Sequence, residues 1–154
     1  MADVFTRAKR SQVMSRIRGR GNKETEVALA RMLRAARITG WRRHSDLFGR
    51  PDFTFRRERV VVFVDGCFWH GCPKHSNMPA TNREFWAKKL GRTKVRDRLV
   101  TRTLRKKGWM VLRIWEHDLR KTPEGCIRRL LTLLEEGATP SGLVPSAKVR
   151  GANR

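Results

Sequence analysis

The apolar run from Val60 to Val64 constrains the fold of this chain more than any other stretch. All of its members are β-branched or aromatic, and no polar residue interrupts them. This pattern is typical of a strand that is covered on both faces of a sheet. We therefore expect a central strand here, with other elements packed on either side.

Shorter segments predict the neighbouring strands. Trp41 to His44 forms one, and the turn Gly49-Arg50-Pro51 leads into another at Asp52 to Phe55. Arg56 to Arg59 then reads as a charged hairpin turn before the central strand. Alternating side chains from Met110 to Trp115 predict the last strand.

Amphipathic stretches with start and stop signals predict the helices. They run from the cap Asn22 to about Ala36, from a capping box at Thr81 to Glu84 down to Lys107 before Gly108, and from Thr122-Pro123 to Gly137. Strands and helices in this order predict an α/β fold with a mixed central sheet flanked by helices.

A chain of 154 residues can bury one hydrophobic core but hardly two, so we expect a single domain. We assign residues 22–137 to this single domain. Residues 1–21 are expected to form a basic N-terminal arm, with a short helix at about Ser11 to Ile17. Residues 138–154, rich in Pro, Gly and Ser, are expected to form a disordered basic tail, and we expect a monomer.

The charge of the chain points to a polyanionic partner. Lys and Arg number 36 against 14 Asp and Glu, which gives a formal net charge of +22. Eleven of these basic residues, with only two acids, lie between Arg83 and Lys107, so phosphate contact is favoured over a merely solvated helix face. Nucleic acid is therefore the leading partner. An anionic membrane surface is the alternative, but no segment offers ~18 consecutive apolar residues.

The start of the chain lacks a secretory signal, so we expect a cytoplasmic, nucleoid-associated protein. Disulfides are then not expected. Cys67-x₄-Cys72-x₂-His75, with His117 after the last strand, offers a ligand set for tetrahedral Zn²⁺. The alternative is a buried pair of free cysteines with surface histidines. Cys126 is interpreted as an inert apolar residue.

Asp52 and Asp65 are candidates for a second kind of metal site. Asp52 begins one strand and Asp65 ends the central one, so the two carboxylates can meet at a sheet edge and hold Mg²⁺. Alternatively, each merely caps a turn. His70 is either a general base or a competing zinc ligand.

Large aromatic residues follow Cys67 in a predicted loop. Phe68 and Trp69 either belong to the core or enter DNA as wedges between bases, because exposed aromatics are costly in water. Trp86, at the start of the basic helix, is a candidate for the same role.

Several short motifs are spread over about residues 8–135. They are Gly49-Arg50-Pro51-Asp52-Phe53, Val62 to Pro73 followed by His75, Phe85-Trp86, Arg96-Asp97-Arg98, Gly108-Trp109 and Trp115-Glu116-His117. Together they resemble the very short patch repair (Vsr) DNA mismatch endonucleases. This resemblance implies a restriction-endonuclease-like fold with a structural zinc, and nicking of duplex DNA 5′ of the T in a T:G mismatch left by deamination of 5-methylcytosine.

The resemblance also implies roles for single residues. Asp52 is similar to the Mg²⁺-binding carboxylate, His70 to the general base, and Glu26 to the acidic residue that supports this centre. The remaining correspondences are the intercalating aromatics Phe68, Trp69 and Trp86, and the zinc ligands Cys67, Cys72, His75 and His117.

The chain differs from one member of this family at two neighbouring positions. Val64 stands where that member has Thr, and it can still offer Mg²⁺ its backbone carbonyl. Asp65 stands where that member has His, and it either adds a metal ligand or orients His70.

Two other functions stay open from the sequence. A zinc-stabilised DNA-binding module without cleavage explains the charge and the zinc motif, but not Asp52 and His70. A restriction-type nuclease would cut both strands of fully paired DNA. A contact with mismatch-repair proteins is also left open.

Overall fold

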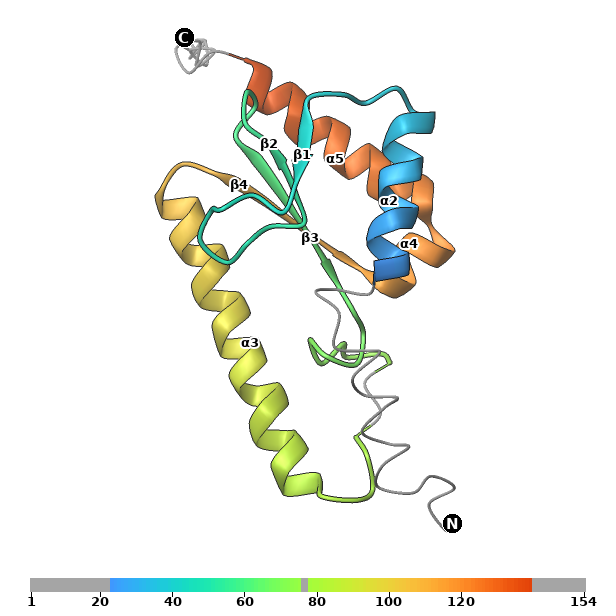
Figure 1. Ribbon diagram of the computed structural model, residues 1–154, viewed down its shortest axis with the longest axis vertical. Helices are drawn as coiled ribbons and strands as arrows, with labels where there is room; N and C mark the ends of the chain where they lie inside the picture. The colour runs from blue at the N-terminus through green and yellow to red at the C-terminus, as the bar shows by residue number, and fades with distance from the viewer. Residues whose placement is uncertain (1–22, 76–77, 140–154) are drawn as a thin grey trace, which may run out of the picture.

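Strand β3 (Val60–Asp65) lies inside a mixed sheet of four strands in a computed structural model, which describes residues 23–75 and 78–139. The sheet has the order β1-β2-β3-β4, with β1 (Trp41–Arg43), β2 (Phe53–Phe55) and β4 (Met110–Trp115) around it (Figure 1). Every residue of β3 is buried, which confirms the central strand that the apolar run predicts.

The sheet topology brings two loops to the same edge. β1, β2 and β3 are antiparallel neighbours, and the predicted turn at residues 56–59 joins the last two. β4 is parallel to β3, and its last residue Trp115 pairs with Asp65. The segments that follow these two residues therefore leave the sheet side by side, although they are about 50 residues apart in sequence.

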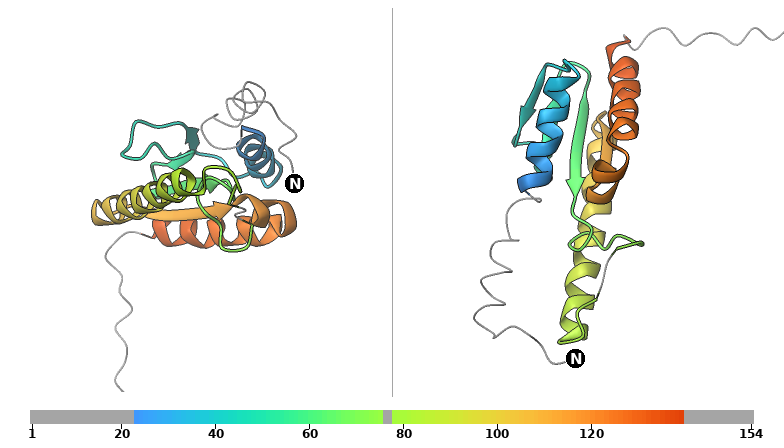
Figure 2. Two further views of the ribbon diagram at one scale, coloured as in Figure 1. Left: turned by 90° about the horizontal axis from the view of Figure 1, so that it is seen from below. Right: turned by 90° about the vertical axis from the view of Figure 1, so that its right-hand side faces the viewer.

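Helices cover both faces of the sheet (Figures 1 and 2). One face carries α2 (Lys23–Ala35), α4 (Glu116–Lys121) and α5 (Pro123–Ala138), and the other carries the long α3 (Arg83–Lys106). The short α4 was not expected from the sequence, because its six residues do not span enough turns to show a periodic pattern.

Side chains of β3 alternate between the two faces of the sheet, and each face has its own hydrophobic cluster. Val60, Val62 and Val64 face α2 and α5, where Leu33 and Leu130 are fully buried. Val61 and Phe63 point the other way, into a smaller apolar cluster with Val100 and Leu104 of α3. Apolar residues on both faces of one strand thus account for the three-layer arrangement.

Two predicted helix boundaries are wrong. The residue that precedes α3 is Asn82, in a left-handed conformation with φ of 56° and without a side-chain cap, so Thr81 and Glu84 do not form a capping box. Gly137 does not end α5, which continues to Ala138.

Other expectations fall on parts of the chain for which no structure is described. The arm helix at Ser11 to Ile17, the cap Asn22 and the tail beyond residue 139 lie outside the described residues. Within residues 23–75 and 78–139, no helix is both long enough and apolar enough to cross a membrane.

Gly137 has a packing role that gives a stability prediction. A Cβ at this position would lie 2.1 Å from the Glu58 backbone oxygen, whereas a Cβ at Gly125 in the same helix would meet nothing closer than 3.8 Å. Gly137→Ala is therefore expected to lower the free energy of unfolding by ~1–3 kcal/mol through overpacking. Gly125→Ala, the matched control, should be neutral or stabilising by up to ~1 kcal/mol. Urea titrations of both variants test this, and equal stabilities would contradict the packing role.

Candidate functional site

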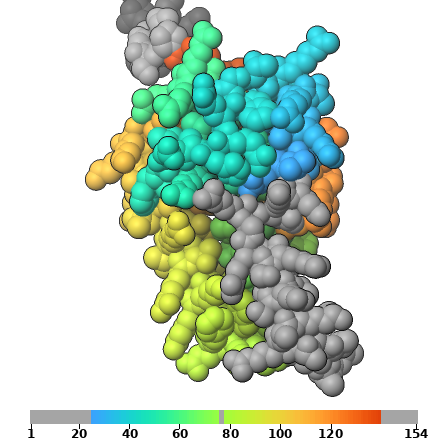
Figure 3. All heavy atoms as spheres, in the orientation of Figure 1, coloured from blue at the N-terminus to red at the C-terminus, as the bar shows by residue number. Residues whose placement is uncertain are grey.

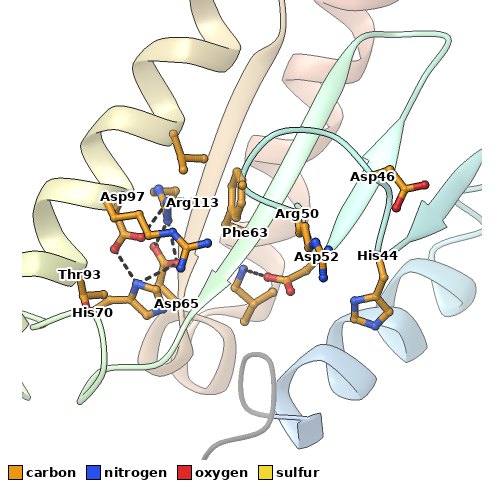
Figure 4. A pocket seen from close by; sticks show the side chains of 14 residues that line it. His44, Asp46, Arg50, Asp52, Phe63, Asp65, His70, Thr93, Asp97 and Arg113 are labelled. Carbon is orange, nitrogen blue, oxygen red and sulfur yellow. Dashed lines mark hydrogen bonds and ion pairs between the residues drawn. The ribbon is translucent and has the colours of Figure 1, made fainter. Parts of the chain in front are cut away.

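A cavity of about 570 Å³ opens where β3 ends, between α3 and the loop that precedes β2. Ionisable side chains gather at its two ends (Figure 4). Asp52 and His44 lie at one end, and His70 lies with Asp65 and Asp97 at the other. The sites that the sequence assigns to hard-metal binding and to proton transfer thus share one cavity.

Asp52 is held at the junction of β2 and β3. Its backbone N–H donates to the Val62 carbonyl at 3.0 Å, and its Oδ2 accepts a hydrogen bond from the Val64 N–H at 2.7 Å. Burial raises the pKa of Asp52 to about 7, against the effect of the Val64 hydrogen bond, and the neighbouring Glu26 carboxyl adds to the rise. A nearby cation would stabilise the ionised form of this buried carboxyl group.

Glu26 of α2 is the acidic neighbour of Asp52. It is only 1% exposed, and its Oε2 accepts a hydrogen bond from Arg43 Nη2 at 2.7 Å. Its other oxygen, Oε1, is buried without a hydrogen-bond partner among the described residues. Such an unpaired oxygen is costly, so the position fits a bound cation.

One ligand atom each from Glu26, His44 and Asp52 lies within 4.8 Å of the others. The Val64 N–H faces Asp52, and in a strand the N–H and C=O of one residue point to the same side. The Val64 carbonyl therefore also faces this cluster. These residues can together hold a divalent cation. His44 was not among the residues that the sequence singled out.

His70 sits in a network of charged groups at the other end. Its Nδ1 lies 2.6 Å from Asp97 Oδ2 and 3.7 Å from Asp65 Oδ1. Burial alone would lower the pKa of His70, but the hydrogen bond to Asp97 and the charge of Asp65 outweigh it and raise the pKa. With Nδ1 engaged by a carboxylate, Nε2 is the ring nitrogen left to exchange a proton with a substrate.

Arg113 of β4 holds both acids of this network. It donates to the two oxygens of Asp65 at 2.9 and 3.0 Å and to Asp97 Oδ1 at 3.3 Å. Burial raises the pKa of Asp65, while His70 and Arg113 act in the opposite direction. The sequence predicts that Asp52 and Asp65 bind one cation together. The contacts disfavour this arrangement, because Arg113 donates hydrogen bonds to both Asp65 oxygens.

Cys67, Cys72, His75 and His117 come together at the edge where β3 and β4 end. Cys67 Sγ lies 3.3 Å from His117 Nδ1, and Cys72 Sγ lies 3.5 Å from the same atom and 3.7 Å from His75 Nδ1. A tetrahedral zinc with ordinary bond lengths separates such ligand atoms by roughly 3.5 Å. His117 Nε2 also lies 3.1 Å from Asp118 Oδ1, a common orienting contact for a ligating histidine.

The donor set is chemically suited to zinc. Burial raises the pKa of the Cys67 thiol, and the nearby Cys72 adds to the rise, so a dication is the natural means of keeping both sulfurs deprotonated. Cys126 is buried in α5 among core residues, away from this cluster.

The aromatic residues form a cluster between the loop after β3 and the start of α3. Phe68 lies 5.0 Å from Trp69 and 5.4 Å from Trp86, measured between ring centroids. Phe85, which is 57% exposed, extends the cluster, and Lys89 Nζ lies 5.1 Å from the Trp69 ring. The Trp69 Nε1–H is buried without an acceptor among the described residues.

Phe85 and Trp86 belong to the first turn of α3, and this first half of the helix extends beyond the sheet (Figures 1 and 3). Exposed basic residues continue from the aromatic cluster along the helix, and they include Arg83, Lys88, Arg92, Lys94, Arg96 and Arg98. Aromatic rings beside exposed cations form a surface suited to nucleic acid.

Three residues of the site were not identified from the sequence. Asp97 lies in the Arg96-Asp97-Arg98 motif but was given no role, and Arg113 carries no local signature of function. Their positions on α3 and β4 direct both toward the cavity. His44 lies 18 residues from Glu26, and only the antiparallel pairing of β1 with β2 places it beside Asp52.

Comparison with known proteins identifies the family. A family model described as DNA mismatch endonuclease Vsr matches residues 2–76. The chain is 36% identical over 152 residues to the DNA mismatch endonuclease Vsr of Escherichia coli (strain K12), which covers 98% of this chain and 97% of that protein.

Type II nicking enzymes are similar as well. The identity to V.NmeDIP of Neisseria meningitidis serogroup C is 37% over 130 residues, or 83% of this chain and 87% of that enzyme. The identity to V.NaeI of Lentzea aerocolonigenes is 44% over 88 residues, which span 57% of this chain and about half, 53%, of that enzyme. The chain therefore belongs to the Vsr DNA mismatch endonuclease family, and it is a DNA endonuclease of the nicking type.

Proposed function

We propose that this endonuclease nicks duplex DNA on the 5′ side of the T in a T:G mismatch that arises from deamination of 5-methylcytosine. The observation that carries the proposal is the cavity with Asp52 at one end, where Glu26 lies next to it, and the His70–Asp97 pair at the other end. A cation site opposite a proton acceptor is what hydrolysis of a phosphodiester requires.

The catalytic cation of the proposal is Mg²⁺, held by the Asp52 carboxylate and the Val64 carbonyl and supported by Glu26. When bound, it polarises the scissile phosphate and stabilises the charge that develops there. Two observations support this assignment: Glu26 Oε1 has no hydrogen-bond partner among the described residues, and the Val64 N–H fixes Asp52 against β3.

His70 acts as the general base. Asp97 accepts a hydrogen bond from Nδ1, so Nε2 is free to take the proton from the attacking water. Asp65 stabilises the imidazolium that results, at 3.7 Å, and Arg113 holds both acids in place. Asp65 is thus assigned the role of orienting His70 rather than of binding metal.

The fold that we propose is restriction-endonuclease-like. Residues 22–137 form the nuclease domain, flanked by a basic arm at residues 1–21 and a basic tail at residues 138–154, and the chain acts as a monomer in the nucleoid. The net charge of +22 supports phosphate contacts from several parts of the chain.

Zinc in the Cys67, Cys72, His75 and His117 cluster is proposed to be structural. The protein as isolated should hold about one Zn²⁺, and Cys67→Ser should lose it and melt at a lower temperature, because zinc binding contributes to folding free energy. Cys126→Ala is the matched control and should keep its zinc. Elemental analysis and thermal melting test this. A folded, active enzyme without zinc would contradict it.

The cluster of Phe68, Trp69 and Trp86 is proposed to wedge into the base stack beside the mismatch. Unstacking costs less at a weak T:G pair than at a normal pair, so an aromatic wedge converts that difference into selectivity.

Trp69→Ala is accordingly expected to slow nicking at T:G by about tenfold or more. Lys88→Ala on α3 is the control and should weaken binding to paired and mismatched DNA alike, with a lower salt dependence. Single-turnover rates and binding across a salt series test both. If Trp69→Ala unfolds the protein and any folded fraction keeps its T:G preference, the residue belongs to the core and the wedge is wrong.

The substrate is tested with matched duplexes that carry either one T:G mismatch or the fully paired sequence, in varied flanking contexts. The proposal predicts a single nick in the T-containing strand of the mismatched duplex. Equal nicking of paired DNA, or cleavage of both strands, would favour a restriction-type nuclease. Binding without any nick would favour a DNA-binding module.

A further inference from the structure

His44 stands beside the proposed metal centre without an assigned role. Its imidazole belongs to the same cluster of possible ligands as Glu26 and Asp52, with ligand atoms within 4.8 Å of one another. Its backbone N–H also lies against the Asp52 carbonyl at 3.4 Å, so the β1–β2 pairing fixes the two residues next to each other.

The contacts that His44 makes within the protein are weak. Its Nε2 lies 3.6 Å from Glu26 Oε2, which is too long for a hydrogen bond. The Glu26 oxygen in question already accepts a hydrogen bond from Arg43 at 2.7 Å, and the other, Oε1, is buried without a hydrogen-bond partner in residues 23–75 and 78–139. In the part of the chain that the structure describes, this carboxylate oxygen and this imidazole both lack a strong partner, and a shared cation would satisfy both.

We infer that His44 is a further protein ligand of the catalytic cation, beside Asp52, the Val64 carbonyl and the supporting Glu26, and that the centre consequently binds Mn²⁺ more tightly than Mg²⁺ while accepting either. This inference rests on the proposed metal centre. Imidazole nitrogen is a poor partner for Mg²⁺, which prefers oxygen, but it binds first-row transition metals well. The side chain of His44 is 39% exposed, so a cation there keeps open positions for water and a phosphate oxygen.

The ligand set predicts how substitutions at His44 change metal binding. Because this residue has a positive φ of 51°, His44→Gly removes the imidazole without backbone strain, and His44→Asp replaces nitrogen by oxygen in a conformation that Asp tolerates. His44→Gly should weaken Mn²⁺ binding by about tenfold or more and Mg²⁺ binding by less than about threefold. His44→Asp should strengthen Mg²⁺ binding relative to the wild type and lower the preference for Mn²⁺.

The test uses the full-length, zinc-loaded protein without DNA. Mn²⁺ is titrated and followed by electron paramagnetic resonance, Mg²⁺ is measured by competition, and spin-echo modulation reports a directly coordinated nitrogen. We expect nitrogen modulation in the wild type and in His70→Ala, and its loss in His44→Gly. Asp46→Asn, which changes a carboxylate of the same cavity outside the ligand cluster, is the matched control and should keep it.

The outcomes separate this inference from the function on which it rests. Two results would overturn the role of His44 but not the metal centre itself. One is Mn²⁺ binding that depends on Asp52 but shows no nitrogen modulation. The other is nitrogen modulation that is lost only in His70→Ala. Mn²⁺ binding that does not depend on Asp52 would overturn both.

Discussion

The Asp52→Asn variant is expected to nick T:G DNA at least about a thousandfold more slowly than the wild type, a loss of ~4 kcal/mol of transition-state stabilisation. Asn has nearly the shape of Asp, and its amide oxygen can still accept the Val64 N–H that Oδ2 accepts at 2.7 Å. The substitution therefore removes the charge that holds the cation while the β2–β3 junction stays intact.

Binding and folding measurements distinguish this loss from general damage. The affinity of Asp52→Asn for DNA should stay within a few fold of that of the wild type, because most of the binding energy comes from phosphate contacts elsewhere on this basic chain. Asp46→Asn lines the same cavity outside the metal cluster and should nick almost normally. Nicking by Asp52→Asn at the wild-type rate in single-turnover assays would remove Asp52 from the metal site.

The second large effect is expected at His70. Loss of a positioned general base costs about 10²–10⁴ in rate, so His70→Ala should slow nicking by that amount. Asp97→Asn should also slow it, since an amide at 2.6 Å from Nδ1 can favour the wrong tautomer of the imidazole. Thr93→Ala, on the same cavity wall, is the control for both.

The zinc cluster complicates this prediction, because His70 lies between Cys67 and Cys72 in sequence. Zinc content and melting temperature of His70→Ala must therefore match those of the wild type before its rate is interpreted. A zinc-loaded His70→Ala enzyme that nicks within about threefold of the wild type would contradict the assignment.

The sequence predicted those parts of the fold that local patterns determine. The apolar run of Val60 to Val64 identified the central strand because burial on both faces leaves no polar residue in it. Thr81 to Glu84 failed as a capping box because the loop before α3 approaches the helix with Asn82 in a left-handed conformation, which the residue pattern does not encode.

The site was predictable only where its residues carry their own chemical signature. The spacing of Cys67, Cys72 and His75 indicated a metal cluster, and the parallel pairing of β3 with β4 brings His117 to it. Asp97 and Arg113 are common residues on a basic helix and an edge strand, so their convergence on His70 depends on tertiary packing. The same holds for His44.

The most direct test of the metal-dependent nicking centre is a single-turnover assay on a duplex with one T:G mismatch and a different label on each strand. The zinc-loaded enzyme is supplied with Mg²⁺, with Mn²⁺, or with a chelator that leaves the zinc in place. We predict one nick, 5′ of the mismatched T, with either added cation and none with the chelator. Nicking at the same rate in the chelator would contradict the account.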